Sequence, residues 1–183
     1  MKRRLTLNVV CMIIVLFFCS ASWGLDEIVE KKTFTLEEFT LISGKKLAPV
    51  KIGYETYGAL ASTKDNVILI CHYYSGNSHA AGKYAATDKV PGYWDKIIGP
   101  GKPFDTTKYF IVSSDTLSNM NPKNPKVITT GPASNDPKTG KPYGMSFPMV
   151  TIRDFVNLQY ELLKSLGVKK LSFNNFLNFP SNL

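Results

Sequence analysis

The chain has 183 residues, of which 44% are hydrophobic and 20% charged, with 11 prolines and 13 glycines. This composition is typical of one globular domain and excludes a largely disordered or repetitive chain. The formal net charge is +8, but the lysines are scattered singly or in pairs, with no basic stripe interleaved with aromatic residues. A solvated surface is therefore predicted, with no nucleic-acid partner.

Residues 1–24 have the three-part layout of a secretory signal peptide. A positive start at 2–4 precedes an apolar run at 5–19, and small residues at 20–24 suit a signal-peptidase site. We therefore expect export, to the periplasm or the medium, with membrane contact only through this segment. Because the segment carries three basic residues and no acid, its removal lowers the net charge to +5.

Two alternatives remain for this segment. An uncleaved membrane anchor is the first, although the apolar run is shorter than the roughly 20 residues that a span needs. A lipoprotein modified at Cys19 is the second, although Phe17 and Phe18 are bulky for such a site. After cleavage Cys71 is the one remaining cysteine, and its apolar surroundings predict a buried small hydrophobe, with a catalytic thiol as the alternative.

The mature chain begins with a predicted β-hairpin. Residues 33–42 are β-rich, residues 43–46 carry a turn signal, and residues 50–57 alternate in polarity. The alternation predicts one half-buried face, formed by Val50, Ile52, Tyr54 and Thr56.

Two buried strands are expected next. The five apolar residues at 67–71 predict a strand covered on both faces, followed by a polar and aromatic loop at 72–79. The run 109–112 predicts a second strand, which ends in Ser113, Ser114 and Asp115. Polar loops after buried strands are where α/β sheets place their ligands.

A long loop and one helix complete the pattern. Six prolines between 114 and 149 argue against any regular element there, and a structureless loop of that length is usually functional. Residues 151–166 predict a helix, with a capping box at Thr151 and Asp154 and a stop at Gly167. Helical spacing places seven residues on its inner face: Ile152, Phe155, Val156, Gln159, Leu162, Leu163 and Leu166. A strand at 168–173 then indicates an α/β fold with a mostly parallel sheet.

Residues 50–171 resemble the homoserine O-acetyltransferase-like branch of the α/β-hydrolase superfamily. The resemblance depends on the order and spacing of several short segments: 54–58, 71–72, 75–82, 92–95, 98–102, 104–106, 130–134, 136–144, 147–148, 150–154 and 166–168. It implies that residues 25–173 are the N-terminal part of an α/β-hydrolase domain, truncated at the strand that leads to the nucleophile elbow. Residues 174–183 form a tail that does not match.

The resemblance implies acyl transfer from a small-molecule donor to a hydroxyl acceptor through an acyl-serine, or ester hydrolysis. It places an oxyanion donor at the backbone N–H of Tyr74 or Ser75. His72 and His79 are interpreted as loop scaffolding, and a residual hydrolase that uses Ser75 or Ser78 with a histidine is the alternative. The polar stretch 117–125 is longer than the small turn of true acetyltransferases, which leaves the acceptor open.

The expected Gly-x-Ser-x-Gly elbow does not follow residue 173. A truncated, inactive relative of the serine acyltransferases is therefore predicted, with no catalytic serine, aspartate or histidine. An exported esterase fragment or a non-catalytic binding module are the alternatives, so enzyme status stays open. No cofactor or metal motif occurs, and Asp95, Asp105, Asp115 and Asp154 are too dispersed in sequence to predict a paired-carboxylate site.

Overall fold

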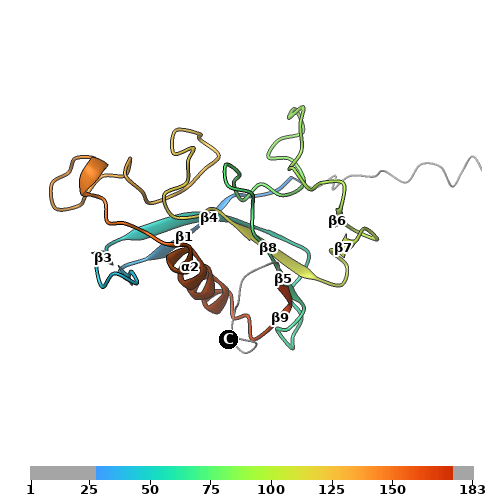
Figure 1. Ribbon diagram of the computed structural model, residues 1–183. Coiled ribbons are helices and arrows are strands. Elements are labelled where there is room, and N and C mark those ends of the chain that lie inside the picture. The colour runs from blue at the N-terminus through green and yellow to red at the C-terminus, as the bar shows by residue number, and fades with distance from the viewer. Residues whose placement is uncertain (1–27, 175–183) are drawn as a thin grey trace, which may run out of the picture.

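The computed structural model describes residues 28–174, so the proposed signal peptide and tail residues 175–183 lie outside the described part. A five-stranded sheet forms the centre of the molecule (Figure 1). From one edge to the other, its strands are β1 (Lys32–Leu36), β4 (Val50–Tyr57), β8 (Phe110–Ser114), β5 (Val67–Ile70) and β9 (Leu171–Asn174).

The predicted hairpin is present. β1 pairs antiparallel with β4, and the short strands β2 (Phe39–Thr40) and β3 (Lys46–Leu47) pair with each other between them. The prediction of one half-buried face is wrong for the second half of β4, where Glu55 and Tyr57 on the opposite face are buried. These two side chains are covered by loops that the local alternation pattern does not reveal.

The sheet is mixed, which corrects the expectation of a mostly parallel one. β8 and β9 both run parallel to β5, whereas β4 runs antiparallel to both β1 and β8. The antiparallel pairs arise because the hairpin adds β4 beside β8 without a crossover helix. The α/β class itself is confirmed.

The central strands are buried on both faces, as their apolar runs predict. Val67 and Leu69 of β5 and Val112 of β8 belong to the apolar cluster on the helix side. Ile68 and Ile70, which alternate with them, belong to a second cluster on the opposite side. The period of two along a strand therefore divides each continuous apolar run between two cores.

Helix α2 (Ile152–Ser165) covers one face of the sheet. Thr151 is its N-cap and forms the predicted capping box with Asp154, and Gly167 follows its end with a φ of 76°. The buried arc is wider than predicted and includes Leu158. Ile152 shares the inner face by spacing but is exposed, because it begins the helix ahead of the turns that pack on the core.

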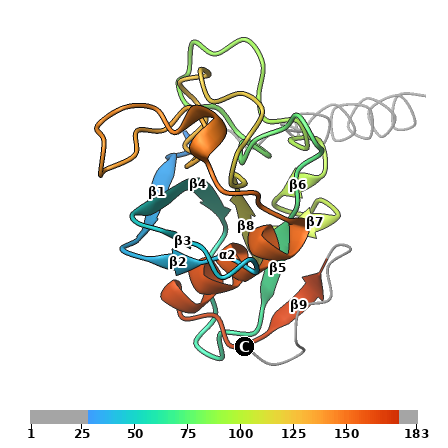
Figure 2. The same ribbon diagram turned by 60° about the vertical axis from the view of Figure 1, so that its left-hand side comes forward.

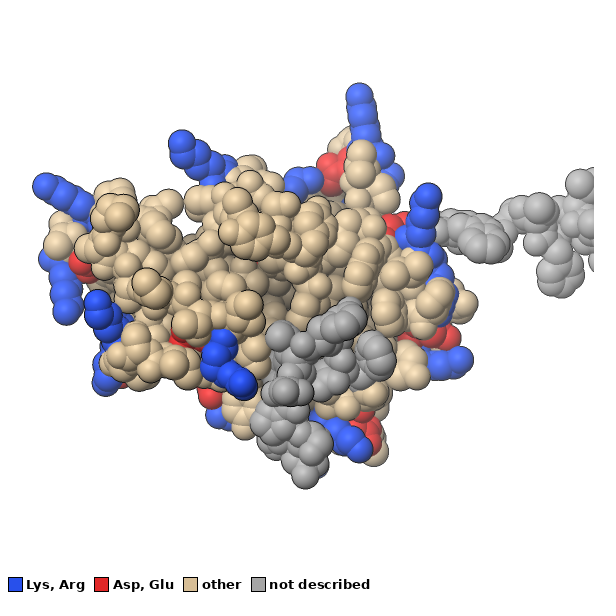
Figure 3. Space-filling model, in the orientation of Figure 1, with Lys and Arg blue, Asp and Glu red and all other residues tan. Residues whose placement is uncertain are grey.

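Long loops lie on the side of the sheet opposite α2 (Figures 1 and 2). Residues 71–109 contain only the two-residue strands β6 (Ile98–Gly99) and β7 (Phe104–Asp105). Between 115 and 151 the single regular element is the 3-10 helix η1 (Gly144–Ser146), in agreement with the proline pattern. On the face shown in Figure 3, lysine and arginine side chains stand apart around the outline instead of forming one patch.

Candidate functional site

The candidate site lies where the parallel strands β5 and β8 end. Because their carboxyl ends share one edge of the sheet, the loop after Ile70 and the loop after Ser114 meet there. Asp115, the first residue after β8, is fully buried. Its Oδ1 atom accepts a 2.7 Å hydrogen bond from the Ser78 amide, which joins the two loops directly.

The proposed oxyanion donors lie at the tip of the first loop. The amide of Gly76 donates to the carbonyl of Tyr73 at 2.7 Å, so Tyr74 and Ser75 are the two central residues of a turn. Both residues are exposed, and Tyr74 is exposed to 85%. Within residues 28–174, no acceptor takes the backbone N–H of either one. Two amide donors are thus available to a ligand at the ends of the parallel strands.

Asparagine side chains from the second loop hold this turn in place. Nδ2 of Asn119 donates to the Gly76 carbonyl, and Nδ2 of Asn121 donates to the Ser75 carbonyl, both at 2.9 Å. Asn119 is itself buried. From the sequence, the polar stretch 117–125 was related only to the identity of the hydroxyl acceptor. The structure shows that two asparagines of this stretch support the turn. An Asn-x-Asn pattern shortly after a buried strand was the available signal.

A buried carboxylate lies behind the loop. Glu55 of β4 accepts hydrogen bonds from the Tyr57 hydroxyl at 2.7 Å, the Tyr84 hydroxyl at 2.6 Å and His79 Nδ1 at 3.0 Å. Burial raises the pKa of Glu55, but these hydrogen bonds and the charge of Lys31 outweigh it and hold the pKa below its ordinary value. Glu55 is therefore a charged group at neutral pH, and the sequence pattern did not identify it.

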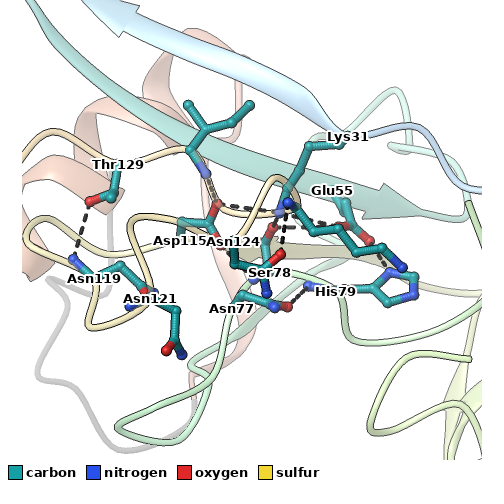
Figure 4. A network of polar contacts seen from close by, with 12 residues as sticks. Lys31, Glu55, Asn77, Ser78, His79, Asp115, Asn119, Asn121, Asn124 and Thr129 are labelled. Atoms are coloured by element: carbon teal, nitrogen blue, oxygen red, sulfur yellow. Dashed lines mark hydrogen bonds and ion pairs between the residues drawn. The ribbon is translucent and has the colours of Figure 1, made fainter. Parts of the chain in front are cut away.

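A lysine joins this carboxylate to the loops (Figure 4). Nζ of Lys31 lies 3.5 Å from Glu55 Oε1 and 3.2 Å from Asp115 Oδ2, and it also donates to the Ser78 hydroxyl. Asp115 is one of the four aspartates that are too dispersed in sequence to predict a paired-carboxylate site. The fold brings it to the same ammonium group as Glu55, a residue that the sequence did not single out.

The two histidines and Ser78 have structural surroundings. His79 donates from Nδ1 to Glu55 and stacks on Tyr84 with ring centroids 4.1 Å apart. His72 donates from Nδ1 to the carbonyl of Tyr73 at 2.7 Å. The segment Gly76-Asn77-Ser78-His79-Ala80 comes close to an elbow motif, but Ser78 is fully buried and cannot meet a substrate. These contacts support the interpretation of both histidines as scaffolding.

Cys71 follows β5 and packs against the helix-side core. Burial raises the pKa of its thiol, and a hydrogen bond from Gln159 offsets this only in part. The thiol is therefore mostly protonated at neutral pH, which makes it a poor nucleophile. Cys71 is half-buried, less than the predicted burial, and its protonated thiol supports its interpretation as a small hydrophobe.

Two further searches cover residues 28–174 alone. In that range, no three histidine, cysteine, aspartate or glutamate side chains are placed to hold one metal ion. Among the same residues, no helix has the length and apolar character needed to cross a bilayer.

Comparison with known proteins identifies the class of the fold. The structure superposes on the crystal structure of esterase E22 with a TM-score of 0.78 and 58% identity, over 80% of this chain and 40% of that one. The crystal structure of homoserine O-acetyltransferase from Bacillus anthracis matches with a TM-score of 0.77 and 52% identity, over 79% of this chain and 39% of that one. The chain has the α/β-hydrolase fold.

Sequence comparison defines the branch. Homoserine O-acetyltransferase of Carboxydothermus hydrogenoformans is 54% identical over 144 residues, which are 79% of this chain and 36% of that protein. No family model matches the chain. The matched residues are similar to part of the proteins of the homoserine O-acetyltransferase-like branch of the superfamily. The chain thus spans less than half the length of the relatives it matches.

Proposed function

We propose that this chain supplies the oxyanion side of a serine acyl-transfer site. The observation that carries the proposal is the exposed turn at Tyr73–Gly76, whose two central amides have no acceptor within the described residues. Such donors stabilise the negative charge that develops on a carbonyl oxygen during acyl transfer. The parent reaction is transfer of an acyl group from a small-molecule donor to a hydroxyl through an acyl-serine.

The 183 residues contain no Gly-x-Ser-x-Gly segment. A donor turn without a nucleophile cannot form an acyl-enzyme, so we propose that these residues alone have no turnover. Purified chain should hydrolyse p-nitrophenyl acetate no faster than buffer, and it should release no CoA from acetyl-CoA in the presence of homoserine. Turnover that survives replacement of Ser75 and Ser78 by alanine would point to a nucleophile elsewhere in the chain.

A chimera tests the oxyanion role directly. Residues 28–173 would be joined to the part of the Carboxydothermus hydrogenoformans relative that lies beyond the aligned segment. Tyr74→Pro removes one N–H donor at a turn position where proline is well tolerated, whereas Tyr74→Ala keeps the N–H. We expect Tyr74→Pro to lower kcat by about 10²- to 10³-fold and Tyr74→Ala to have a much smaller effect. Equal losses in both variants would assign the role to the side chain instead.

Ester hydrolysis is the second candidate, favoured by the similarity to esterase E22. The two reactions share the acyl-serine and differ in whether a hydroxyl acceptor or water removes the acyl group. In the chimera, addition of homoserine during p-nitrophenyl acetate turnover separates them. Formation of O-acetylhomoserine supports transfer, and acetate as the single product supports hydrolysis.

Export remains part of the proposal, supported by the positive, apolar and small-residue order of residues 1–24. N-terminal sequencing of the protein recovered outside the cytoplasm should begin at residue 25. Recovery of the uncleaved chain in the membrane would support the anchor alternative.

A further inference from the structure

Lys31 is a nearly buried lysine that the acyl-transfer chemistry does not use. Its side chain is 12% exposed, and its ammonium group contacts three oxygen atoms, from Glu55, Asp115 and Ser78. These partners come from β4, from the loop after β8 and from the loop after β5. The residue just before β1 therefore connects the sheet to both loops of the candidate site (Figure 4).

The contacts of Lys31 reach the proposed oxyanion turn through Ser78. The Ser78 hydroxyl accepts from Lys31, and the Ser78 amide donates to Asp115. The other oxygen of Asp115 accepts from the Ile128 amide at 2.9 Å, so the same carboxylate also holds the second loop. Ser78 is two residues beyond Gly76, the last residue of the turn. Fixing Ser78 therefore fixes the end of the segment that presents the two amides.

The sheet provides space for this arrangement at Gly53. A Cβ atom at Gly53 would overlap Oδ2 of Asp115 and would lie 3.2 Å from Cε of Lys31. The φ of Gly53 is not in the left-handed region, so backbone conformation does not require glycine there. Glycine is needed at this position because the side chains of Lys31 and Asp115 pack directly against the backbone of β4.

Electrostatics explains why the ammonium matters. Glu55 and Asp115 are both fully buried, and two carboxylates near one another in a buried site disfavour simultaneous ionisation. In the described part of the chain, the charges and donors facing this pair are Lys31, His79, Tyr57 and Tyr84, together with the Ser78 hydroxyl and the Ser78 and Ile128 amides. Among the described residues, Lys31 is the cation shared by both carboxylates.

We propose that Lys31 is a positioning residue that holds the Tyr73–Gly76 turn by neutralising Glu55 and Asp115 and by binding Ser78. The oxyanion role of the turn rests on the proposed function. The contacts by which Lys31 holds the turn are a property of this chain and do not depend on that function. Loss of the ammonium leaves the two buried carboxylates without their shared cation and removes the bond from Lys31 to the Ser78 hydroxyl, which keeps only its 3.4 Å hydrogen bond to Glu55 Oε1. One carboxylate then takes up a proton as the pH falls, and the repulsion is relieved.

Hydrogen exchange on the full chain tests the proposal. Lys31→Met roughly keeps the length of the side chain and removes its charge. Lys32→Met is the matched control, because the ammonium group of Lys32 bonds, among the described residues, only to the Thr56 hydroxyl at 3.0 Å. At about pH 8, Lys31→Met should exchange about tenfold faster over residues 72–79, with α2 unchanged. At about pH 5.5, after correction for intrinsic rates, exchange should return toward that of the unmodified chain.

Three results would overturn the proposal. Unchanged exchange over residues 72–79 in Lys31→Met means that the lysine does not hold the loop. Faster exchange in α2 as well, without recovery at lower pH, means that it stabilises the whole fold. An equal effect in Lys32→Met means that any positive charge near the start of β1 is enough to slow exchange in the loop. Ser78→Ala, which keeps every charge, should give a smaller acceleration that does not depend on pH, and this variant is available if Lys31→Met does not fold.

The chimera separates this inference from the proposed function. There, Lys31→Met should lower kcat more than it changes KM, and its activity relative to the unmodified chimera at the same pH should recover as the pH falls. An inactive chimera whose loop exchange still responds to Lys31→Met would reject the proposed function and leave the positioning role intact. An active chimera that Lys31→Met leaves unchanged in both kcat and exchange would reject the positioning role alone.

Discussion

Two regions of the central sheet are stabilised in different ways: the face covered by α2, called here the helix side, and the carboxyl edge with its loops, called here the loop side. On one side α2 packs Val156, Leu158, Leu162 and Leu163 onto the strands, and the interface is mostly apolar. At the carboxyl edge, the loops after β5 and β8 are held by buried charges and by side-chain bonds to backbone groups. Hydrophobic burial is non-directional, whereas hydrogen bonds fix orientation. The helix side therefore provides stability, and the loop side provides geometry.

The largest expected effect comes from the helix side. Leu162 is fully buried in the core, and Leu162→Ala should lower the free energy of unfolding by about 2–5 kcal/mol through lost burial and a cavity. A denaturant titration measures the change. Ile152→Ala on the same helix is the control, because Ile152 is 69% exposed and its loss should cost much less. Similar losses in both variants would contradict the packing described for α2.

Gly53→Ala should disturb the loop side instead. The added Cβ displaces Asp115, and we expect a cost of about 1–3 kcal/mol together with faster hydrogen exchange over residues 72–79. Lys51→Ala is the control, because Lys51 lies on the same strand with an exposed side chain. Loss of stability without any change in the loop would show that Asp115 does not transmit the strain.

The smallest effect should appear on acidification. The pKa of Glu55 is lower in the folded chain than its ordinary value of 4.5. Its contribution to stability is therefore fully present above that value and is lost as the pH falls through the folded pKa. Urea titrations between about pH 7 and pH 3 should show this loss, and Glu55→Gln should reduce it. An unchanged loss of stability on acidification in Glu55→Gln would assign that loss to other groups.

Local sequence patterns predicted the helix side well. The capping box at Thr151, the stop at Gly167 and the two-sided strand at 67–70 are all confirmed, since each depends on residues close in sequence. The same patterns could not show the loop side. Lys31 and Asp115 are 84 positions apart, and Asp115 by itself looks like an ordinary polar residue after a strand.

The resemblance of short segments also predicted the branch of the superfamily, and the comparisons confirm it. The placement of the oxyanion donors at Tyr74 and Ser75 stays a prediction, supported by the exposure of both residues and by the lack of an acceptor for either amide within residues 28–174. Sequence alone did not identify Asn119 and Asn121 as supports of that turn. Their contacts depend on how two loops fold against each other, and neither loop has a regular hydrophobic pattern from which burial could be predicted.

By itself, the sequence determined the strands, the helix and its caps, because backbone preference and hydrophobic spacing act over a few residues. The tertiary structure decided that the sheet is mixed, that Glu55 is buried, and that Lys31 lies between Glu55 and Asp115. The physical reason is that an ion pair depends on distance in space. Only the packing of β1, β4 and β8 brings these three charges within reach of one another.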